Sequence, residues 1–328
     1  MSSHTVSDPI RAAWPEHGLR NASPSQHNET SSRVWQLYER VSRFFHEPLA
    51  YRFLPALHIK QEGLADLDQE RNACIASSEG KIERMPFLTA DGVTLDGAIL
   101  WNNKAEAEDS AYHKRAWILY FNGNGETYED SLRLLSWYGQ ETDCNVICFN
   151  YRGVGYSEST PYRASDLSLD GDAVFQFLLR HHVPSERILI HGRSLGGAIG
   201  TSVRSMHPEG PLCNERSFDR SQNVYKNLYE KVCAAFMGWE FDPITDWQPI
   251  TGKKWVIVSP TDEVIDYETA SFYRGLAKIS DTSLQVIHLP AQYSWPSQLP
   301  VGHNIRLNYE EYASCWAEHK KLVKDCFK

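Results

Sequence analysis

The sequence has no stretch that would place the protein in a membrane and no block that would bind it to nucleic acid. No run approaches the roughly 18 consecutive apolar residues that a transmembrane helix needs. The net charge is -9 and the basic residues do not cluster, which excludes nucleic acid as an expected partner. The first 32 residues lack the basic and apolar regions of a signal peptide. We therefore expect a cytoplasmic protein and leave export by a signal-independent route open.

The sequence also lacks the paired cysteines of a disulfide framework. Its seven cysteines are odd in number and scattered, which is typical of reduced thiols. Cys144 and Cys148 are four residues apart on a predicted strand and therefore share one face. The two further ligands that a zinc site would need are missing nearby. We expect two buried apolar groups there, with no metal and no other cofactor.

The chain of 328 residues divides into three predicted regions. Residues 1–32 are polar and rich in Ser, Asn, His and Pro, which predicts a disordered terminus. Residues 33–80 are predicted to be a helical extension, because "SSRVWQLYERVSRFFHE" spaces its apolar residues as a helix does. That helix either packs on the core or lies on the surface and contacts a membrane or a partner.

Residues 81–328 are predicted to form one α/β domain. It opens with an antiparallel hairpin at 83–101, where residues alternate on both sides of Ala-Asp-Gly. Strand patterns then follow at 116–122, 145–151, 187–192, 254–259 and 284–289, with a shorter one in "PLCNERSF". Helical patterns lie near 128–141, 165–182, 195–206, 266–278 and 306–325. Apolar strands separated by helices indicate a mostly parallel sheet covered on both faces, with its chemistry at the carboxyl ends of the strands.

The stretch "RILIHGRSLGGAIG" places a serine between two glycines where a predicted strand meets a predicted helix. A Gly-x-Ser-x-Gly turn in this setting strains the serine backbone and holds the hydroxyl above the sheet. Gly192 and Gly196 let strand and helix approach closely, and the helix N-terminus offers N–H groups to an anion. Ser194 is therefore the candidate nucleophile. The alternative is a small-residue turn that only permits tight packing.

A serine nucleophile needs a base, and the base needs an acid to orient it. In this topology the chain order is Ser, then Asp or Glu, then His. Asp262 lies just beyond the strand "KWVIVS", on the loop where the acid is expected. Glu263 and Asp266 are the alternatives, and a capping or solvated role remains open for these carboxylates.

The base is predicted to be His303, in the loop "PVGHNIRL" between the last strand and the last helix. Two other histidines follow the acid. His288 lies inside a strand pattern, where a core or sheet-face role is expected, and His319 lies in a polar terminal helix, where solvent exposure is expected. His191 stands next to the serine turn but belongs to a strand, so its side chain should point away from the site.

An oxyanion needs two N–H donors. The backbone N–H of Leu195, which follows the nucleophile, is predicted to be one of them. The loop "FNGNGE" should supply the other, from Asn124 or alternatively Gly125. A glycine-rich loop can also hold phosphate, but no Walker-type or dinucleotide-binding pattern accompanies this one.

Five motifs in this order resemble the α/β-hydrolase superfamily: "YFNGNG", "FNYRGVGYSES", "HGRSLGGA", "SPTDEVI" and "GHN". The second and third of these motifs are similar to its small-lidded esterase, thioesterase and depalmitoylase-like branch. "NERSFDRSQNV" and "GWEFDPITDW" resemble the lipase/esterase-like proteins of Chlamydia and Legionella, some of which are delivered into host cells. The resemblance covers roughly residues 85–310. Asn122 and Gly123 stand where many relatives have His-Gly, but a backbone donor does not need that side chain.

The resemblance implies an α/β-hydrolase fold with a mostly parallel central sheet, helices on both faces and a small lid near 218–250. It implies a serine hydrolase of the carboxylesterase, lipase or thioesterase type. Ser194 would attack an acyl carbonyl, His303 would move the proton, and Asp262 would orient His303. The expected partners are acyl esters, thioesters or lipid-like substrates, with peripheral membrane contact left open.

Substrate contacts are predicted for Gly123, Gly125, Arg193 and Trp295. Trp295, in the loop "QYSWPSQLPVG", either touches substrate or packs. The segment "VYKNLYEKVCAAFMGW" forms either a core-packed helix or a lid over an acyl pocket. Two other functions remain open: a serine peptidase of the prolyl-peptidase type, and an interaction protein with an inactive site.

Overall fold

The computed structural model describes residues 61–102, 112–225, 231–232, 238–279, 284–293, 300–307 and 312–328. Several predictions fall outside these residues: the disordered terminus at 1–32, the first helix of the extension, Trp295, and most of the segment proposed as a lid helix. Helix α2 (Gln61–Ser77) is the described part of the helical extension.

Eight strands form one sheet in the order β1-β2-β4-β3-β5-β6-β7-β8. β2 pairs antiparallel with β1 and β4, and every other neighbouring pair is parallel. The strands are β1 (Ile82–Leu88), β2 (Thr94–Leu100), β3 (Trp117–Phe121), β4 (Asn145–Phe149), β5 (Ile188–Arg193), β6 (Leu212–Glu215), β7 (Lys254–Val258) and β8 (Gln285–His288). β9 (Gln292–Tyr293) and β10 (Pro300–Val301) form a separate antiparallel pair.

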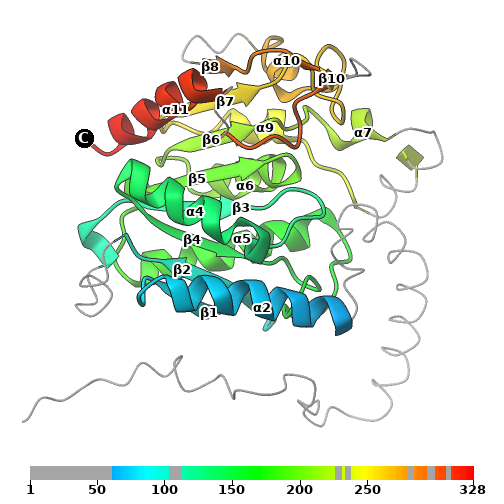
Figure 1. The fold of residues 1–328 in the computed structure, drawn as a ribbon. Helices are drawn as coiled ribbons and strands as arrows, with labels where there is room; N and C mark the ends of the chain where they lie inside the picture. The colour runs from blue at the N-terminus through cyan, green and yellow to red at the C-terminus, as the bar shows by residue number, and fades with distance from the viewer. Residues whose placement is uncertain are drawn as a thin grey trace, which may run out of the picture. The chain divides into compact units, whose positions relative to one another are not determined.

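Helices cover both faces of this sheet (Figure 1). α2, α4 and α11 cover one face, while α5 and α6 cover the other and α9 packs on α6. The remaining bounds are α4 (Tyr128–Thr142), α5 (Ala164–Arg180), α6 (Leu195–Met206), α7 (Ser221–Val224), α9 (Pro243–Trp247), α10 (Phe272–Leu276) and α11 (Ala313–Cys326). Three-residue 3-10 turns lie at Tyr112–Lys114 and Ser185–Arg187.

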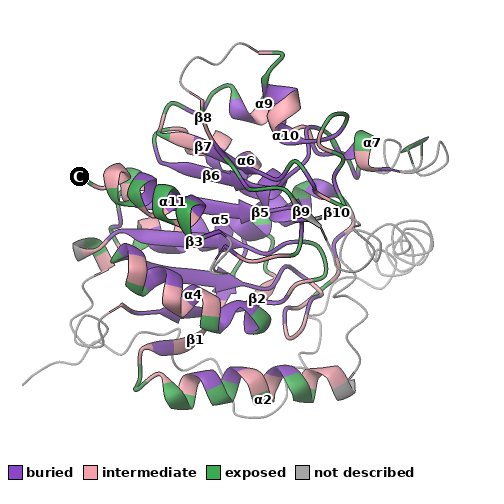
Figure 2. Ribbon diagram, turned by 45° about the horizontal axis from the view of Figure 1, so that its top comes forward, coloured by how far each residue is buried: buried purple, intermediate pink, exposed green. Residues whose placement is uncertain are grey.

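The sheet strands are apolar without interruption because both of their faces are buried. Figure 2 shows the central strands as buried and the outer faces of the helices as exposed. Along β3, Leu119 and Phe121 join the apolar cluster under α5 and α6, whereas Ile118 and Tyr120 join the cluster under α4 and α11. The alternation of strand side chains thus builds two core layers from one strand.

Helix α4 begins at a capping box. The Thr127 hydroxyl accepts the backbone N–H of Asp130, and the Asp130 carboxylate accepts the N–H of Thr127 at 3.2 Å. The helix ends at Asp143, which adopts left-handed backbone angles and donates its N–H to the Gly139 carbonyl. This reciprocal cap fixes the first turn of the helix that follows β3.

The predicted elements agree with the structure except near the C-terminus. The hairpin, the parallel strands and the helices over 128–141, 165–182 and 195–206 are confirmed within a few residues. The helix predicted at 266–278 is reduced to α10, because the Asp266 carboxylate closes a turn with the N–H groups of Glu268 and Thr269. The helix predicted at 306–325 begins at Ala313.

Helix α2 contacts the sheet and α4 through Arg71, whose guanidinium lies 3.9 Å from the buried Asp96 carboxylate of β2. The Arg84 guanidinium makes a two-pronged ion pair with Asp96, with bonds of 2.7 and 3.0 Å. Arg71 of α2 lies 3.5 Å from the Glu129 carboxylate of α4. Burial, and then the nearby Asp96 charge, raise the pKa of Glu129 to about 7. The extension therefore meets the domain at a polar and partly titratable contact.

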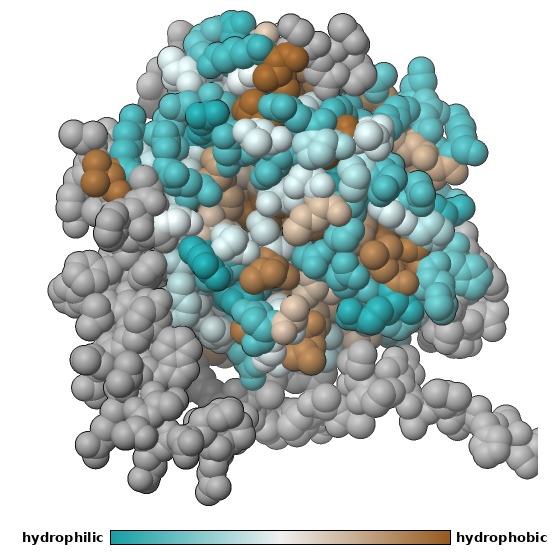
Figure 3. Space-filling view, turned by 180° about the vertical axis from the view of Figure 1, so that it is seen from behind, coloured by the Kyte–Doolittle hydropathy of each residue, from teal (hydrophilic) through white to brown (hydrophobic). Residues whose placement is uncertain are grey.

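Exposed large apolar side chains are scattered over the described surface: Leu88, Leu169, Met206, Val232 and Val264. Figure 3 shows the rear face as mostly hydrophilic, with its hydrophobic residues in small separate groups. Scattered apolar residues of this kind are ordinary on a protein surface. No helix in the described ranges combines the length and the apolar character needed to cross a bilayer.

Candidate functional site

The turn between β5 and α6 holds Ser194 in a strained conformation. Its backbone angles are φ 54° and ψ -120°, in a region that non-glycine residues rarely enter. A Cβ on Gly192 would lie 2.1 Å from the Gly196 carbonyl oxygen, and one on Gly196 would lie 2.3 Å from the Phe121 carbonyl oxygen. Both positions therefore require glycine. The Ser194 N–H is anchored to the Glu215 carbonyl at 2.8 Å.

Three side chains from separate loops form a continuous hydrogen-bonded line. Ser194 Oγ lies 2.9 Å from His303 Nε2, and His303 Nδ1 lies 2.8 Å from Asp262 Oδ2. The ionised carboxylate accepts only, so it selects the tautomer with the proton on Nδ1. Nε2 is then free of a proton and can accept the serine hydroxyl proton, as general-base catalysis requires.

The two neighbouring carboxyl groups, predicted as alternatives, bind different parts of the same histidine. Asp262 Oδ2 faces the His303 ring, and its Oδ1 accepts the N–H groups of Val264 and Ile265 at 2.9 and 2.7 Å. Glu263 Oε2 accepts the backbone N–H of His303 at 2.9 Å. The ring partner is therefore Asp262, and Glu263 holds the main chain.

The remaining candidate residues lie elsewhere. Asp266 only closes its own exposed turn. His288 is exposed on the edge strand β8. His191 points to the far side of the sheet, where it bonds to Glu215 and Tyr138. His319 corrects a prediction: it is fully buried rather than solvated, because the inner face of α11 packs it beneath Tyr138 and Trp255.

The nucleophile and the base are themselves mostly buried. Ser194 is 6% exposed and His303 is 4% exposed. The loop of His303 passes so close to the end of β7 that a Cβ on Gly302 would lie 2.3 Å from Ser259 Oγ. Low solvent access strengthens the interactions among these charged and polar groups.

The loop after β3 lies beside the serine turn, since a Cβ on Gly123 would be 3.5 Å from the Arg193 carbonyl oxygen. The Gly123 N–H donates to Glu126 Oε2 at 2.8 Å and is therefore occupied. Asn124 and Gly125 form the exposed tip of the loop, and Gly125 has φ 78°. Leu195 opens α6, where the first N–H groups have no partner within the helix.

Arg193, a predicted substrate contact, forms bonds within the protein. Its guanidinium is buried, pairs with Glu126, and donates to the His303 carbonyl at 2.9 Å and to Asn304 Oδ1 at 3.1 Å. These internal bonds account for most of the guanidinium, and its contact with substrate stays a prediction. The position next to the nucleophile made Arg193 look like a ligand contact, but the sequence could not show which way its side chain turns.

Sequence reasoning missed three charged residues around the site: Glu126, Glu215 and Arg216. Their signal was positional, because each stands just beyond or at the carboxyl end of a parallel strand, where functional groups gather. Glu126 follows β3, and the other two close β6.

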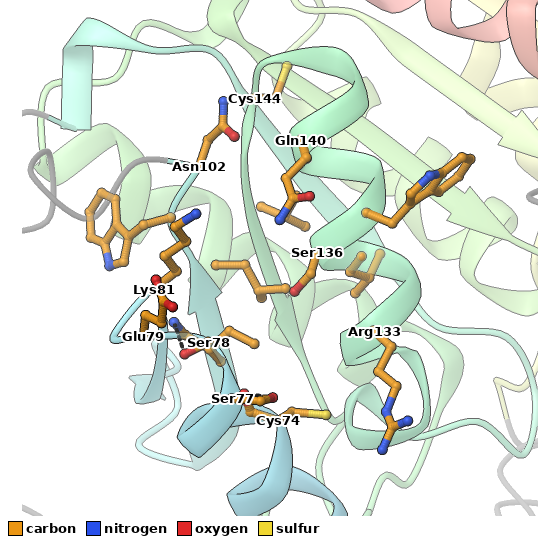
Figure 4. A pocket seen from close by; sticks show the side chains of 17 residues that line it. Cys74, Ser77, Ser78, Glu79, Lys81, Asn102, Arg133, Ser136, Gln140 and Cys144 are labelled. Atoms are coloured by element: carbon orange, nitrogen blue, oxygen red, sulfur yellow. Dashed lines mark hydrogen bonds between the residues drawn. The ribbon is translucent and has the colours of Figure 1, made fainter.

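A cavity of about 380 Å³ lies away from these loops, between the end of α2, the β1–β2 hairpin and α4. Figure 4 shows polar side chains around it from two sides, including Lys81 from the hairpin and Arg133, Ser136 and Gln140 from α4. None of its lining residues belongs to the line of Ser194, His303 and Asp262. The cavity is therefore separate from the candidate catalytic site.

A family model described as the alpha/beta hydrolase fold matches residues 116–210, from the start of β3 to beyond the end of α6. The eight-stranded sheet, its single antiparallel β2 strand and the helices on both faces agree with that description. The chain has the α/β-hydrolase fold.

Two solved structures extend the likeness to most of the fold. An esterase from Pyrococcus furiosus has a TM-score of 0.58 and 13% identity, over 77% of this chain and 94% of that one. An alpha-beta hydrolase from Vibrio vulnificus also has a TM-score of 0.58, with 14% identity over 94% of this chain and 98% of that one. At these identities the likeness shows the fold alone.

Curated relatives match over a shorter stretch. Protein bem46 of Schizosaccharomyces pombe is 28% identical over 150 residues, which are 45% of this chain and 48% of the relative. The YfhR protein of Escherichia coli K12 is 31% identical over 116 residues, which are 35% of this chain and 39% of the relative. The chain thus spans less than half the length of each of these relatives.

Proposed function

We propose that the protein is a serine hydrolase that cleaves carboxylic esters or thioesters through an acyl-enzyme. The observation that carries the proposal is the line from Ser194 Oγ to His303 Nε2 at 2.9 Å and from His303 Nδ1 to Asp262 Oδ2 at 2.8 Å. The strained serine turn at the start of α6 supports the same function, because it presents the hydroxyl at the end of the sheet.

In the acylation step, Ser194 Oγ attacks the acyl carbonyl carbon while its proton passes to His303 Nε2. Asp262 stabilises the imidazolium that forms and keeps the ring in place. The tetrahedral intermediate then collapses, the bond to the leaving alcohol or thiol breaks, and His303 returns the proton to the leaving group. The acyl group is left on the serine.

Deacylation repeats these steps with water as the nucleophile. His303 takes a proton from water, the hydroxyl attacks the acyl-serine carbonyl, and the proton returns to Ser194 as the acid leaves. In both steps the oxyanion is held by the N–H of Leu195 and by a second donor from the loop after β3. We assign that donor to Asn124, with Gly125 as the alternative. Losing one such donor typically costs about 10²–10³ in rate.

The substrate class is proposed from two features. The neighbours in the fold include an esterase, which favours carboxylic esters over peptides. Only a small segment, near 218–250, separates β6 from β7, so we propose an accessible site for small acyl esters, lipid-like esters or acylated protein. Predicted substrate contacts at Gly123 and Gly125 stay part of this proposal.

The test is labelling with a fluorophosphonate probe, which reacts only with an activated serine. We expect the wild type to be labelled, and Ser194→Ala and His303→Gln to lose labelling while remaining folded by circular dichroism. Ser202→Ala on the same helix is the matched control, since that hydroxyl bonds to Ser168 of α5 at 3.2 Å, and it should label as the wild type does. A panel of p-nitrophenyl esters and acyl-thioesters of increasing chain length then measures the acyl pocket.

The outcomes separate the competing functions. A folded wild type that resists the probe would reject the hydrolase and leave an interaction protein with an inactive site. The 2.9 Å bond between Ser194 and His303 argues against that outcome. A labelled protein that cleaves prolyl peptides and no ester would be a peptidase instead.

The narrower resemblance to lipase/esterase-like proteins of Chlamydia and Legionella stays a prediction, as do the cytoplasmic location and delivery into a host cell. Fusing the N-terminal 80 residues to a reporter enzyme and measuring its translocation from a secretion-competent bacterium tests the delivery signal. Retention of the reporter in the bacterium would contradict the predicted delivery into a host cell.

A further inference from the structure

Two buried arginines hold the loop that carries His303. Arg216 Nη1 donates to the carbonyl oxygens of Gly302 and, at 2.6 Å, Ile305. Arg193 Nη2 donates to the carbonyl oxygen of His303 at 2.9 Å. Backbone carbonyls before, at and after the candidate base are thus bound by two guanidinium groups, one at the end of β5 and one directly after β6.

Arg216 reaches the loop from an unusual backbone. It has φ 49°, a left-handed conformation that is uncommon for a residue with a side chain, and its N–H donates to the Ile257 carbonyl at 2.7 Å. Its side chain has no exposed area and pairs with the carboxylate of Glu215. Strain of this kind persists only where the surrounding structure enforces it, and it concentrates at functional sites.

Glu215 is itself held by a chain of hydrogen bonds across the sheet. The chain runs from Trp255 Nε1 to His319 Nδ1 at 3.1 Å, from His319 Nε2 to the Tyr138 hydroxyl at 2.7 Å, and from that hydroxyl to His191 Nδ1 at 2.9 Å. His191 Nε2 completes it at 2.8 Å from Glu215 Oε2. An indole N–H can only donate and an ionised carboxylate can only accept, so every proton in the chain points toward Glu215.

The charges at the two ends of this chain agree with that direction. Burial lowers the pKa of His319 well below its usual range, so its ring is neutral. Burial opposes the ionisation of Glu215, but Arg216, His191 and Arg193 together hold its pKa well below the usual range. Glu215 therefore presents a fixed negative charge to Arg216.

Glu126 is the carboxylate that pairs with Arg193. Its Oε1 pairs with Arg193 and, at 2.7 Å, with Arg306 near the end of the His303 loop. Its Oε2 accepts the N–H of Gly123 in the predicted oxyanion loop. One carboxylate thereby touches the serine turn, the histidine loop and the loop after β3.

The residues linked to Glu215 and those linked to Glu126 meet at a small cavity of about 30 Å³. The cavity is lined by Tyr138, His191 and Glu215 from the first group and by Arg193 and Arg306 from the second. The polar groups therefore form one cluster, which includes Arg193 of the serine turn and Arg306 of the His303 loop.

We propose that Arg193 and Arg216 are positioning residues that lock the His303 loop against the serine turn and β6, with Glu126 and Glu215 as their counter-ions. This inference rests on the proposed function and assigns it two arginines and two carboxylates beyond the triad. A guanidinium has five N–H donors in a plane, so it can bind a carboxylate and two carbonyls together, which a lysine ammonium cannot do with the same geometry.

The experiment compares Arg193→Lys and Arg216→Lys with Arg204→Lys. Arg204 is a matched control, because its guanidinium is also fully buried and donates to backbone carbonyls, at His207 and Ile188, but at the C-terminal end of α6. The readouts are amide hydrogen exchange over residues 301–307, kcat and KM on the best ester, and thermal stability.

We expect exchange in that segment to rise by about tenfold or more in Arg193→Lys and Arg216→Lys. We expect kcat to fall about a hundredfold with KM little changed, because misplacing the base by about 1 Å costs a factor of that order. The Nδ1 proton resonance of His303 should broaden or vanish from the low-field NMR spectrum. Arg204→Lys should lose thermal stability without any of these changes.

Two results would overturn the inference: unchanged loop exchange in both variants, or changes equal to those of Arg204→Lys. If the lysine variants do not fold, Glu126→Gln keeps the volume and one acceptor oxygen while removing the charge and the second acceptor, and the same exchange measurement decides. Loop exchange does not depend on catalysis. An unlabelled wild type would therefore reject the proposed function, while the exchange data would still judge the two arginines.

Discussion

At the scale of single residues, the two carboxyl groups beside His303 bind different parts of it. Asp262 faces Nδ1 of the ring, and Glu263 accepts the main-chain N–H. Only a group on the ring can set its tautomer and stabilise the imidazolium. The two side chains are adjacent in sequence and therefore form a natural matched pair for mutation.

We expect Asp262→Asn to lower kcat by about 10⁴, because the amide would favour the wrong tautomer of His303. Glu263→Gln should lower it by less than about tenfold, since the amide oxygen still accepts the N–H. Steady-state kinetics on one ester, with far-ultraviolet circular dichroism to check folding, measure both. Equal losses in the two variants would reject the assignment of Asp262 to the ring.

Motifs and chain order were enough to choose the candidate triad from the sequence. Ser194, Asp262 and His303 could be chosen because each stands after a strand, in an order that the fold demands. Arg193 was predicted to contact substrate from its place beside the nucleophile. The sequence did not predict its cluster with Glu126, Glu215 and Arg216, because the direction of a side chain depends on the neighbours that surround it. His319 was placed in solvent because α11 has many charged residues, although one face of that helix is buried.

At the scale of elements, the start of α4 matters to the site because it directly follows the predicted oxyanion loop. Thr127 is the N-cap residue, and its side chain accepts the N–H of Asp130. Gly123 and Glu126 are bonded to each other in the four residues before it. A secure first turn of α4 therefore also limits the movement of that loop.

Thr127→Ala should lower the free energy of unfolding by about 1 kcal/mol through loss of the cap. Thr127→Ser keeps a hydroxyl at the same place and should recover most of that loss. Urea unfolding followed by tryptophan fluorescence measures both variants. Equal stability of the alanine and serine variants would mean that the hydroxyl does not cap the helix.

Most elements could be predicted from periodicity, and the exceptions have local causes. The whole pattern at 266–278 looked helical, but at its start the Asp266 carboxylate competes for the backbone N–H groups that a helix would use. The start of the last helix was predicted too early, because residues 302–306 are committed to the site by Arg193, Arg216 and Glu126. Long-range bonds of this kind leave no periodic signal in the sequence.

At the scale of the whole molecule, the fold was predictable because both faces of the sheet are covered. Continuous apolar strands alternating with helices indicate this architecture, and the strand order follows the expected α/β arrangement. The attachment of α2 was not predicted, since it uses buried charges from four elements: Arg71, Arg84, Asp96 and Glu129. Polar contacts between distant segments require the fold before they can be seen.

This buried contact makes the stability of the molecule depend on pH. Burial and the nearby Asp96 raise the pKa of Glu129 to about 7, above the ordinary value of 4.5 expected for the unfolded chain. Between these values the folded protein binds more protons at Glu129 than the unfolded chain does. The free energy of unfolding therefore falls as the pH rises from about 4.5 through 7, and the contribution of Glu129 is complete only below that window.

Glu129→Gln removes this titration while keeping an oxygen that can accept the Asn150 side-chain amide, as Glu129 does at 2.9 Å. We expect the variant to match the wild type in melting temperature near pH 4.5 and to be the more stable of the two at pH 8.

Glu141→Gln on the same helix is the control. A bond to Lys320 lowers the pKa of Glu141, so its loss should act in the opposite direction. Melting curves for the three proteins from pH 4.5 to 8 measure the effect. A wild type and Glu129→Gln that stay parallel across this range would show that Glu129 remains ionised beside Arg71, and that the contact between α2 and α4 is a permanent ion pair rather than a titrating one.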